Sequence, residues 1–301
     1  MSLSADTTLA LPAAAPFDFS QSVSFLDGFS PCADGRICRD AELVTGGFAP
    51  EPFVAHLSPD GPDAVRAHVD WLRAAGDGSA VAAHLDNFLS LSDDLTPMYE
   101  AAQADEAFAS VVGDLFGYHH VGFPTPFEAA CWAALSQQTS IRVATELRDA
   151  LVRAVGRVAV VDGTAVSLFP TPAMVRARPD EIRDAIGNER KTKSLLAAAE
   201  AFLEHDLANL TTDDLLTQLA DVWGFGSWSA EFIALRGFGR MSILPSEESR
   251  LCTAVGDVYG IENATMNDVR RCADPYGDCR GYWAHYIRVW DFLGDESVSD
   301  D

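Results

Sequence analysis

The stretch DVWGFGSWSAEFIALRGFGRMSILPSEESRL, residues 221–251, determines how this chain is interpreted. Gly224 and Gly226 enclose Phe225 between two helix-forming segments. Glycine permits positive φ and close backbone approach, and the N–H groups that open the second helix are free to meet a phosphate. Such a helix–hairpin–helix unit would bind a nucleic-acid backbone without reading its sequence. The alternative is an ordinary connection between two helices.

The composition indicates a folded chain that does not enter a membrane. Its 301 residues are 48% hydrophobic, enough for two domains with a sizeable core. Residues 1–16 lack the basic region of a signal peptide, and no apolar run reaches the roughly 18 residues of a membrane span. We therefore expect a cytoplasmic monomer without membrane contact.

The charge is strongly acidic, with a formal net charge of −24 at pH 7. Lys191 and Lys193 are the only lysines among 21 basic residues, a composition that resembles proteins of extremely salt-loving archaea. The alternative is an ordinary acidic cytosolic protein. An acidic surface argues against a nucleic-acid partner, but the argument weakens in molar salt, where the Debye length falls to about 3 Å.

The hydrophobic pattern divides the chain into an N-terminal α+β part and a longer part that reads as almost wholly helical. The Ser/Asp-rich segment 90–97 is the expected boundary, and Thr125 followed by Pro126 and Glu128 marks a helix start. The expected divisions are a flexible N-terminus (1–16), an α+β domain (17–92), a helical domain (93–293) and an acidic tail (294–301).

The cysteines do not form a recognisable metal or disulfide pattern. Their spacing is irregular and no C-x-x-C occurs, so a disulfide scaffold is not expected. Cys131 lies on an apolar helical face and is expected in the core. The six positions are Cys32, Cys38, Cys131, Cys252, Cys272 and Cys279.

Four segments in order resemble the helix–hairpin–helix DNA glycosylase superfamily, most closely the AlkA-type 3-methyladenine glycosylases. One is the hairpin itself, from Leu219 to Pro245. The others are FDFSQSVSFL (17–26), PFEAACWAALSQQTS (126–140) and AIGNERKTKSLLAAAEAF (185–202).

The resemblance implies a mainly α fold, with two helical subdomains of the glycosylase type preceded by a small α+β domain. It also implies an enzyme of base excision repair that flips an alkylated purine out of double-stranded DNA and hydrolyses its N-glycosidic bond. Its cellular place would be the cytoplasm, associated with the nucleoid. The alternative is a lesion-recognition or DNA-binding protein of the same fold without catalysis; a helical domain with no DNA role is weaker.

The resemblance assigns DNA contacts to two regions. Gly224, Phe225 and Gly226 would grip a phosphate, with a monovalent cation held by hairpin carbonyls as a further option. Gln138, beside Gln137, would wedge into the gap left by the flipped base; the alternative is a residue that caps a helix end. Contacts to phosphates are expected from Arg190, Lys191 and Lys193, although a solvated helix end explains these three equally well.

Aromatic residues are candidates to stack on a cationic alkylated base, because ring faces attract cations. Trp228 and Phe232 match pocket-lining positions of the family, and Trp283 and Trp290 are further candidates. The alternative for each is simple core packing.

Two departures from the family pattern limit the chemistry. Bifunctional members carry a nucleophilic lysine where this chain has Trp228, so strand cleavage through a Schiff base is not expected. Cys272 and Cys279 have the spacing of the first two ligands of the family's iron–sulfur cluster, but Tyr282 and Arg288 occupy the places of the other two. No cluster and no metal are expected.

A third departure concerns the catalytic carboxylate. The family's Asp past the proline is replaced by glutamate, and the register favours Glu248, with Glu247 beside it. Glu248 extends the apolar stripe of its helix and is expected to face a cleft. The alternative is that both acids only favour the positive end of the helix macrodipole.

Overall fold

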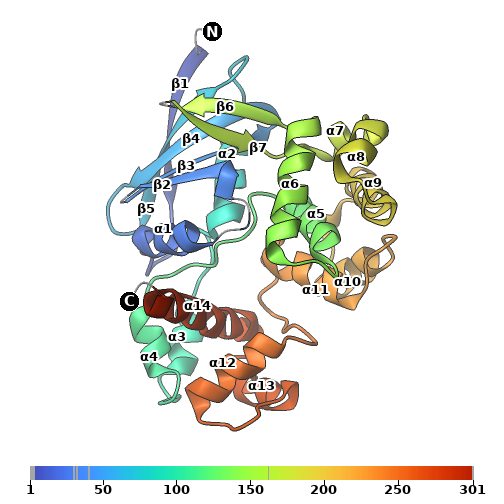
Figure 1. Cartoon of the computed structure of the whole chain (residues 1–301). Helices are drawn as coiled ribbons and strands as arrows, with labels where there is room; N and C mark the ends of the chain where they lie inside the picture. The colour runs from blue at the N-terminus through green and yellow to red at the C-terminus, as the bar shows by residue number, and fades with distance from the viewer. Residues whose placement is uncertain (1–3, 30, 32, 40, 162, 300–301) are drawn as a thin grey trace.

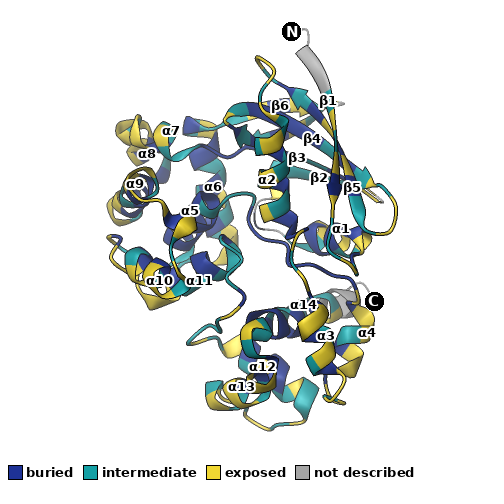
Figure 2. Ribbon diagram, turned by 180° about the vertical axis from the view of Figure 1, so that it is seen from behind, coloured by how far each residue is buried: buried dark blue, intermediate teal, exposed yellow. Residues whose placement is uncertain are grey.

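The computed structural model describes residues 4–29, 31, 33–39, 41–161 and 163–299. Three parts are visible in Figure 1: a sheet, a group of helices below it that includes the last helix of the chain, and a second helical group at its side. Buried residues lie on the inner faces of the strands and helices, while exposed residues follow the outer sides of α8, α10 and α13 (Figure 2).

An antiparallel sheet in the order β1-β5-β4-β3-β2 forms the N-terminal part. In β5, Val65, Ala67, Val69 and Trp71 are buried and alternate with more exposed residues, the period-2 pattern of a strand with one face on a core. The elements are β1 (Ser4–Pro12), α1 (Phe19–Gly28), η1 (Ala33–Gly35), β2 (Arg36–Arg39), β3 (Glu42–Ala49), β4 (Glu51–Pro59), β5 (Ala64–Trp71) and α2 (Gly78–Leu89).

The N-terminal segment differs from the prediction that residues 1–16 are flexible. β1 is an edge strand paired with β5, with Leu9 opposite Ala67 and Leu11 opposite Val65. Leu11 is buried in the core. The alternation of Leu9 and Leu11 is the signal for this strand, and the pairing orders residues 4–12; residues 1–3 lie outside the described part.

A first helical group shares one hydrophobic core with the sheet. Leu91, Leu95 and Met98 belong to the same cluster as residues of the strands and of α14. The boundary expected near residue 92 is thus a change from sheet to helices within one core. The group comprises α3 (Thr96–Ala102), α4 (Ala109–Asp114), α12 (Ser249–Tyr259), α13 (Met266–Ala273), η3 (Asp274–Cys279) and α14 (Arg280–Ser299).

The second helical group has a core of its own, formed by residues between Phe127 and Ala234. As predicted, Thr125 is the N-cap of α5, and its hydroxyl accepts a hydrogen bond from the Glu128 N–H at 3.1 Å. Cys131 is buried in the core. The helices are α5 (Pro126–Ser136), α6 (Ile141–Val155), α7 (Pro172–Arg176), α8 (Pro179–Ile186), α9 (Glu189–Glu204), η2 (Leu207–Asn209), α10 (Thr212–Ala220) and α11 (Ser227–Arg236).

A β-hairpin interrupts this group, although residues 93–293 were expected to be almost wholly helical. β6 (Arg157–Val161) pairs antiparallel with β7 (Thr164–Leu168), and the hairpin lies beside the sheet in Figure 1. Ala159 and Leu168 pack on Val54 of β4. The valine-rich strands are stabilised by this packing, which joins the second helical group to the sheet.

A buried ion cluster also connects the second helical group with the N-terminal part. Arg148 of α6 and Glu128 of α5 are each 2% exposed, and their side chains are 2.7 Å apart. The Arg148 guanidinium also pairs with Asp34 of η1. An unpaired charge at such a site would cost several kcal/mol, so the cluster fixes where η1 meets α5 and α6.

The C-terminal segment is helical for most of the range predicted as an acidic tail (294–301). α14 continues through Ser299, and residues 300–301 lie outside the described part. Within that part, no helix is both long enough and apolar enough to cross a membrane.

Three histidines in and around the sheet-side core make stability depend on pH. Burial lowers the pKa of His84 to about 4, and burial together with Arg236 and His285 holds the pKa of His120 well below its usual 6.5. Burial, with Arg236 and Arg288 nearby, likewise holds the pKa of His285 well below 6.5. Because the folded pKa values are depressed, the unfolded chain binds more protons at acid pH. Stability is therefore complete above about pH 6.5 and is lost as the pH falls toward 4.

We predict that lowering the pH from 7.5 to 5.5 at constant salt reduces the free energy of unfolding by about 1 kcal/mol for each of these histidines. Urea unfolding followed by circular dichroism measures the change. His120→Gln, which has no titrating ring, should remove about a third of this pH dependence. Equal pH dependence in the variant and the wild type would contradict the assignment.

Candidate nucleic-acid interface and active site

The hairpin between α10 and α11 has the geometry that its glycines require. Gly224 has φ +88°, and Gly226 is the N-cap of α11 with extended backbone. No side chain caps α11, so the N–H groups of its first turn stay open to a ligand. The helix N-terminus, with its partial positive charge, can bind a phosphate there.

Close packing explains the first glycine. A Cβ on Gly224 would lie 2.7 Å from the Ser194 hydroxyl oxygen of α9, whereas a Cβ on Gly226 would meet nothing within 4 Å. Gly224 is therefore needed for the contact between the hairpin and α9. Gly226 leaves an open surface at the start of α11.

The glutamine pair has two different environments. The Gln137 amide nitrogen donates to the Gly224 carbonyl at 2.9 Å and to the Ser229 hydroxyl at 3.0 Å. This side chain holds the hairpin and is not directed at a DNA partner, which corrects its predicted contact with DNA. Gln138 is exposed and has φ +51°, a left-handed turn just past the end of α5. That placement is compatible with the predicted wedge.

The basic residues at the start of α9 also have different environments. Arg190 is exposed. The Lys191 ammonium donates to the carbonyls of Leu135 at 2.6 Å and Gln137 at 2.9 Å, and its predicted contact with a phosphate stays a prediction. The Lys193 ammonium lies 4.1 Å from the ring centroid of Trp223.

Trp223 is a hairpin residue that the sequence analysis did not single out. It is 41% exposed, which is unusual for so large an apolar side chain, and it lies one residue before Gly224. Its exposed ring, with the Lys193 ammonium over one face, forms part of the surface around the hairpin. Only the folded structure brings Lys193 to it, because the two residues are 30 positions apart.

A recess of about 150 Å³ lies between the glutamine turn, the start of α9 and the hairpin. Gln138, Arg190 and Gly224 are among the residues that line it. The three segments that the family resemblance assigned to DNA contact therefore meet at one place.

The aromatic candidates separate into one stacked pair with an exposed outer ring, Trp228, and two packing residues. Trp228 is 43% exposed and stacks on Phe232, with ring centroids 5.5 Å apart and planes inclined by 19°. Trp283 is fully buried against Tyr259 and other core rings. Trp290 joins α14 to α4 through a hydrogen bond to Asp114 at 2.8 Å. The predicted pocket role of Trp283 and Trp290 is therefore corrected.

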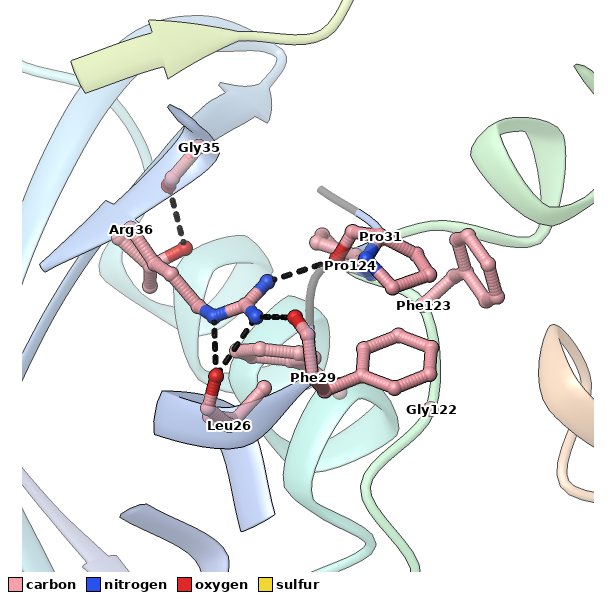
Figure 3. Close-up of a pocket in the computed structure, with 10 residues that line it drawn as sticks. Leu26, Phe29, Pro31, Gly35, Arg36, Gly122, Phe123 and Pro124 are labelled. Carbon is pink, nitrogen blue, oxygen red and sulfur yellow. Dashed lines mark hydrogen bonds between the residues drawn. The ribbon is translucent and has the colours of Figure 1, made fainter. Parts of the chain in front are cut away.

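The stacked pair continues inward as a row of rings. Phe232 meets Phe123 at 5.7 Å, and Phe123 meets Phe29 at 6.4 Å. Phe29 follows α1, and Figure 3 shows it beside Phe123 at the wall of a small cavity. The Arg36 guanidinium fixes this loop by donating to the carbonyls of Leu26, Phe29 and Pro31. The row of rings thus joins α11 to the N-terminal part.

The side chains of the two glutamates between α11 and α12 have different contacts. Glu248 is the N-cap of α12, and its carboxylate accepts a hydrogen bond from Arg288 of α14 at 3.0 Å. It lies on the α14 side and shares the Arg288 guanidinium with Asp291. Glu247 is exposed, and no hydrogen bond or ion pair of its side chain occurs within the described part of the chain.

A further carboxylate places this connection beside α11. Glu231 accepts hydrogen bonds from the Ser246 N–H at 2.8 Å and from its hydroxyl at 2.9 Å. Since Trp228 and Glu231 are three residues apart on one helix, they lie on neighbouring positions of its surface. Glu247 therefore follows directly after a residue fastened beside the Trp228–Phe232 face. No local sequence pattern signals the Glu231–Ser246 or Glu248–Arg288 pairs.

The described cysteines pack as ordinary side chains. Cys252, Cys272 and Cys279 are partly buried against the core shared with the sheet. Within the described residues, no group of three or more His, Cys, Asp or Glu side chains is placed to hold a metal ion. Cys32 lies outside the described part.

Comparisons of the sequence identify relatives of one kind. No protein-family model matches. The chain is 22% identical over 214 residues to the DNA-3-methyladenine glycosylase of Bacillus subtilis (strain 168), covering 69% of this chain and 71% of that protein. It is 28% identical over 249 residues to the probable bifunctional transcriptional activator/DNA repair enzyme AlkA of Mycobacterium tuberculosis, covering 80% of this chain and 49% of that longer protein.

Solved structures agree on the fold. The 3-methyladenine DNA-glycosylase from Archaeoglobus fulgidus superposes with a TM-score of 0.76 at 18% identity, covering 95% of this chain and 98% of that one. A Clostridium acetobutylicum 8-oxoguanine glycosylase/lyase in complex with double-stranded DNA gives 0.69 at 14% identity, covering 98% and 100%. The overall architecture of this chain is therefore that of the DNA glycosylases in these structures.

The relatives found by sequence carry the names of 3-methyladenine and AlkA-type DNA repair enzymes. The chain is similar in sequence to these enzymes and shares its fold with a 3-methyladenine glycosylase, in agreement with the resemblance of its four sequence segments.

The packing at Gly224 yields a prediction about stability. Gly224→Ala combines a left-handed backbone with a contact too close to Ser194, so we expect a loss of about 2 kcal/mol in the free energy of unfolding. Gly226→Ala has open space and extended backbone, and should cost at most about 1 kcal/mol as a poorer N-cap. Urea unfolding compares the two variants.

A double variant tests the cause. Removing the hydroxyl in Ser194→Ala should return part of the stability lost by Gly224→Ala, while the cost of the left-handed backbone remains. Equal stability of Gly224→Ala and Gly226→Ala would show that the contact with α9 does not constrain the hairpin.

Proposed function

We propose that this DNA glycosylase excises alkylated purines of the 3-methyladenine type from double-stranded DNA and leaves an intact abasic strand. The observation that carries the proposal is the exposed Trp228 ring stacked on the half-buried Phe232, on the helix that begins at the hairpin. A phosphate held at the start of α11 would bring the adjoining nucleotide to this pair.

The aromatic pair suits a positively charged base. Alkylation of a purine ring nitrogen creates a cation, and the electron-rich face of an indole attracts it, most strongly where water is excluded. A cationic base is also a good leaving group that requires little help from a general acid. The reaction therefore needs mainly an extruded base, a stacking surface and a carboxylate near the sugar.

We propose that Glu247 supplies this carboxylate, although the sequence pattern favours Glu248. The Glu248 carboxylate is bound to Arg288, and a carboxylate paired with a guanidinium stabilises a developing positive charge less well. Glu247 is exposed and follows Ser246, which Glu231 holds beside the Trp228 side of α11. Glu247 would stabilise the oxocarbenium-like sugar and orient the attacking water.

The wedge and the phosphate contacts complete the proposal. Gln138 would fill the gap left by the extruded base and could hydrogen-bond to the opposite base. Arg190 and the N–H groups that open α11 would hold phosphates. A monovalent cation at the hairpin carbonyls is compatible with the donor set, since a carbonyl keeps a second lone pair when it accepts one hydrogen bond. We propose a monomer acting alone on its DNA.

The two glutamates can be distinguished by charge-removing substitutions. Glu247→Gln should slow base release from methylated duplex DNA by about 100- to 1,000-fold, the usual cost of removing one electrostatic stabiliser from an active site. Affinity for abasic DNA should be unchanged. Glu248→Gln should retain release within a few-fold at saturating enzyme, with lower thermal stability because Arg288 loses a partner.

Single-turnover release of methylated bases measures both variants on the same substrate. Loss of release in Glu248→Gln with full activity in Glu247→Gln would return the catalytic role to Glu248. No release by the wild type would reject the proposed function as a whole.

The product provides a separate prediction. With Trp228 where a lyase lysine would stand, borohydride should trap no covalent adduct between the wild-type protein and damaged DNA. Trp228→Lys places a lysine at the lyase position and serves as the positive control. Trp223→Lys replaces the other exposed tryptophan near the hairpin and serves as the matched control. An adduct with the wild-type chain would show that the enzyme is bifunctional.

A further inference from the structure

Lys191 lies at the junction of the three DNA-facing segments. Its ammonium is bound by the last carbonyls of α5, those of Leu135 and Gln137, at 2.6 and 2.9 Å. The Gln137 carbonyl also accepts a hydrogen bond from the Thr139 hydroxyl at 3.0 Å. The residue between these partners is Gln138, the proposed wedge.

The turn at Gln138 requires such support. A left-handed backbone at a residue other than glycine costs on the order of 1 kcal/mol, and Gln138 has φ +51°. The last carbonyls of α5 have no partners within their own helix. A cation that binds these carbonyls satisfies them and also complements the negative end of the helix macrodipole.

The same network continues to the hairpin. Gln137 donates through its side chain to the Gly224 carbonyl at 2.9 Å, while its own carbonyl is held by Lys191. Ser194, one turn along α9 from Lys191, packs directly against Gly224. The start of α9 thus fixes the distance between the Gln138 turn and the phosphate-binding end of α11.

We infer that Lys191 is a positioning residue for base extrusion: its ammonium holds the α5 terminus so that Gln138 projects into the DNA while the hairpin binds the backbone. The inference rests on the proposed function. Lys191 does not bind DNA itself, in contrast to the exposed Arg190. Burial, and next the charge of Arg190, lowers the pKa of the Lys191 ammonium, which is half-buried at the edge of the recess.

Matched lysine variants test this role. Lys191→Met and Lys193→Met remove the same charge two residues apart, but only Lys191 touches the wedge turn. Lys191→Met should lower the maximal rate of base release by at least 10-fold with little change in KM, because a displacement near 1 Å of a positioning group can cost about 100-fold. Lys193→Met should raise KM with the maximal rate unchanged. Lys191→Arg, which retains the donors, should recover part of the rate.

A spectroscopic measurement separates this role from the proposed chemistry. 2-Aminopurine placed beside a non-cleavable lesion analogue becomes fluorescent when it unstacks. Lys191→Met should lose most of this signal at saturating protein, and Lys193→Met should keep it. Loss of the signal with retained affinity supports the inference even if the wild type releases no base.

A double-variant cycle and amide exchange complete the test. If Lys191 acts through Gln138, Lys191→Met should reduce the signal no further in a Gln138→Ala background. Amide exchange in residues 137–140 of the free Lys191→Met protein should accelerate while exchange in the α14 core is unchanged, which verifies that the variant is folded. Additive losses, unchanged exchange at 137–140, or a Lys191→Met effect confined to KM would overturn the inference.

Discussion

The structure depends on one close approach, between Gly224 of the hairpin and Ser194 of α9. A side chain at position 224 would meet the serine hydroxyl at 2.7 Å, so the two backbones come together only because the residue is glycine. This contact fixes the start of α11, and with it the direction of the open N–H groups. The Gln137 amide and the Lys191 ammonium extend the same contact to the end of α5.

The acidic composition explains why interior geometry matters more than surface charge here. A chain with a net charge of −24 gains little from releasing counterions when it binds DNA. Of the three basic residues at the start of α9, Lys191 binds backbone carbonyls and Lys193 lies over Trp223. Recognition would then rest on backbone N–H groups, stacking and a preformed wedge, interactions that molar salt screens less than exposed ion pairs.

The sequence predicted the parts of the molecule that depend on local rules. Gly224, the cap at Thr125 and the buried Cys131 followed from backbone freedom, capping chemistry and helical periodicity. β1 was missed because its alternating pattern is limited to Leu9 and Leu11, next to Pro12. The β6–β7 hairpin was missed because its strands are stabilised by packing on the sheet.

The site was predicted less completely because the role of each side chain depends on contacts with residues that are far away in the sequence. Lys191 and Arg190 have the same local sequence signal, yet only one of them lies beneath the end of α5. Trp283 and Trp228 are both plausible stacking residues by composition, and burial alone separates them. Glu247 and Glu248 are adjacent, and Arg288, 40 residues further along the chain, distinguishes their surroundings.

The central claim is that a stacked aromatic pair beside the hairpin receives a cationic base and that the chain then releases it. Chromatography of the bases freed from methylated duplex DNA in molar KCl, with enzyme in excess over DNA, tests this most directly. The account predicts release of methylated purines and negligible release from the unmethylated duplex. Tight binding of methylated DNA with no free base would contradict it and leave a protein that recognises lesions without excising them.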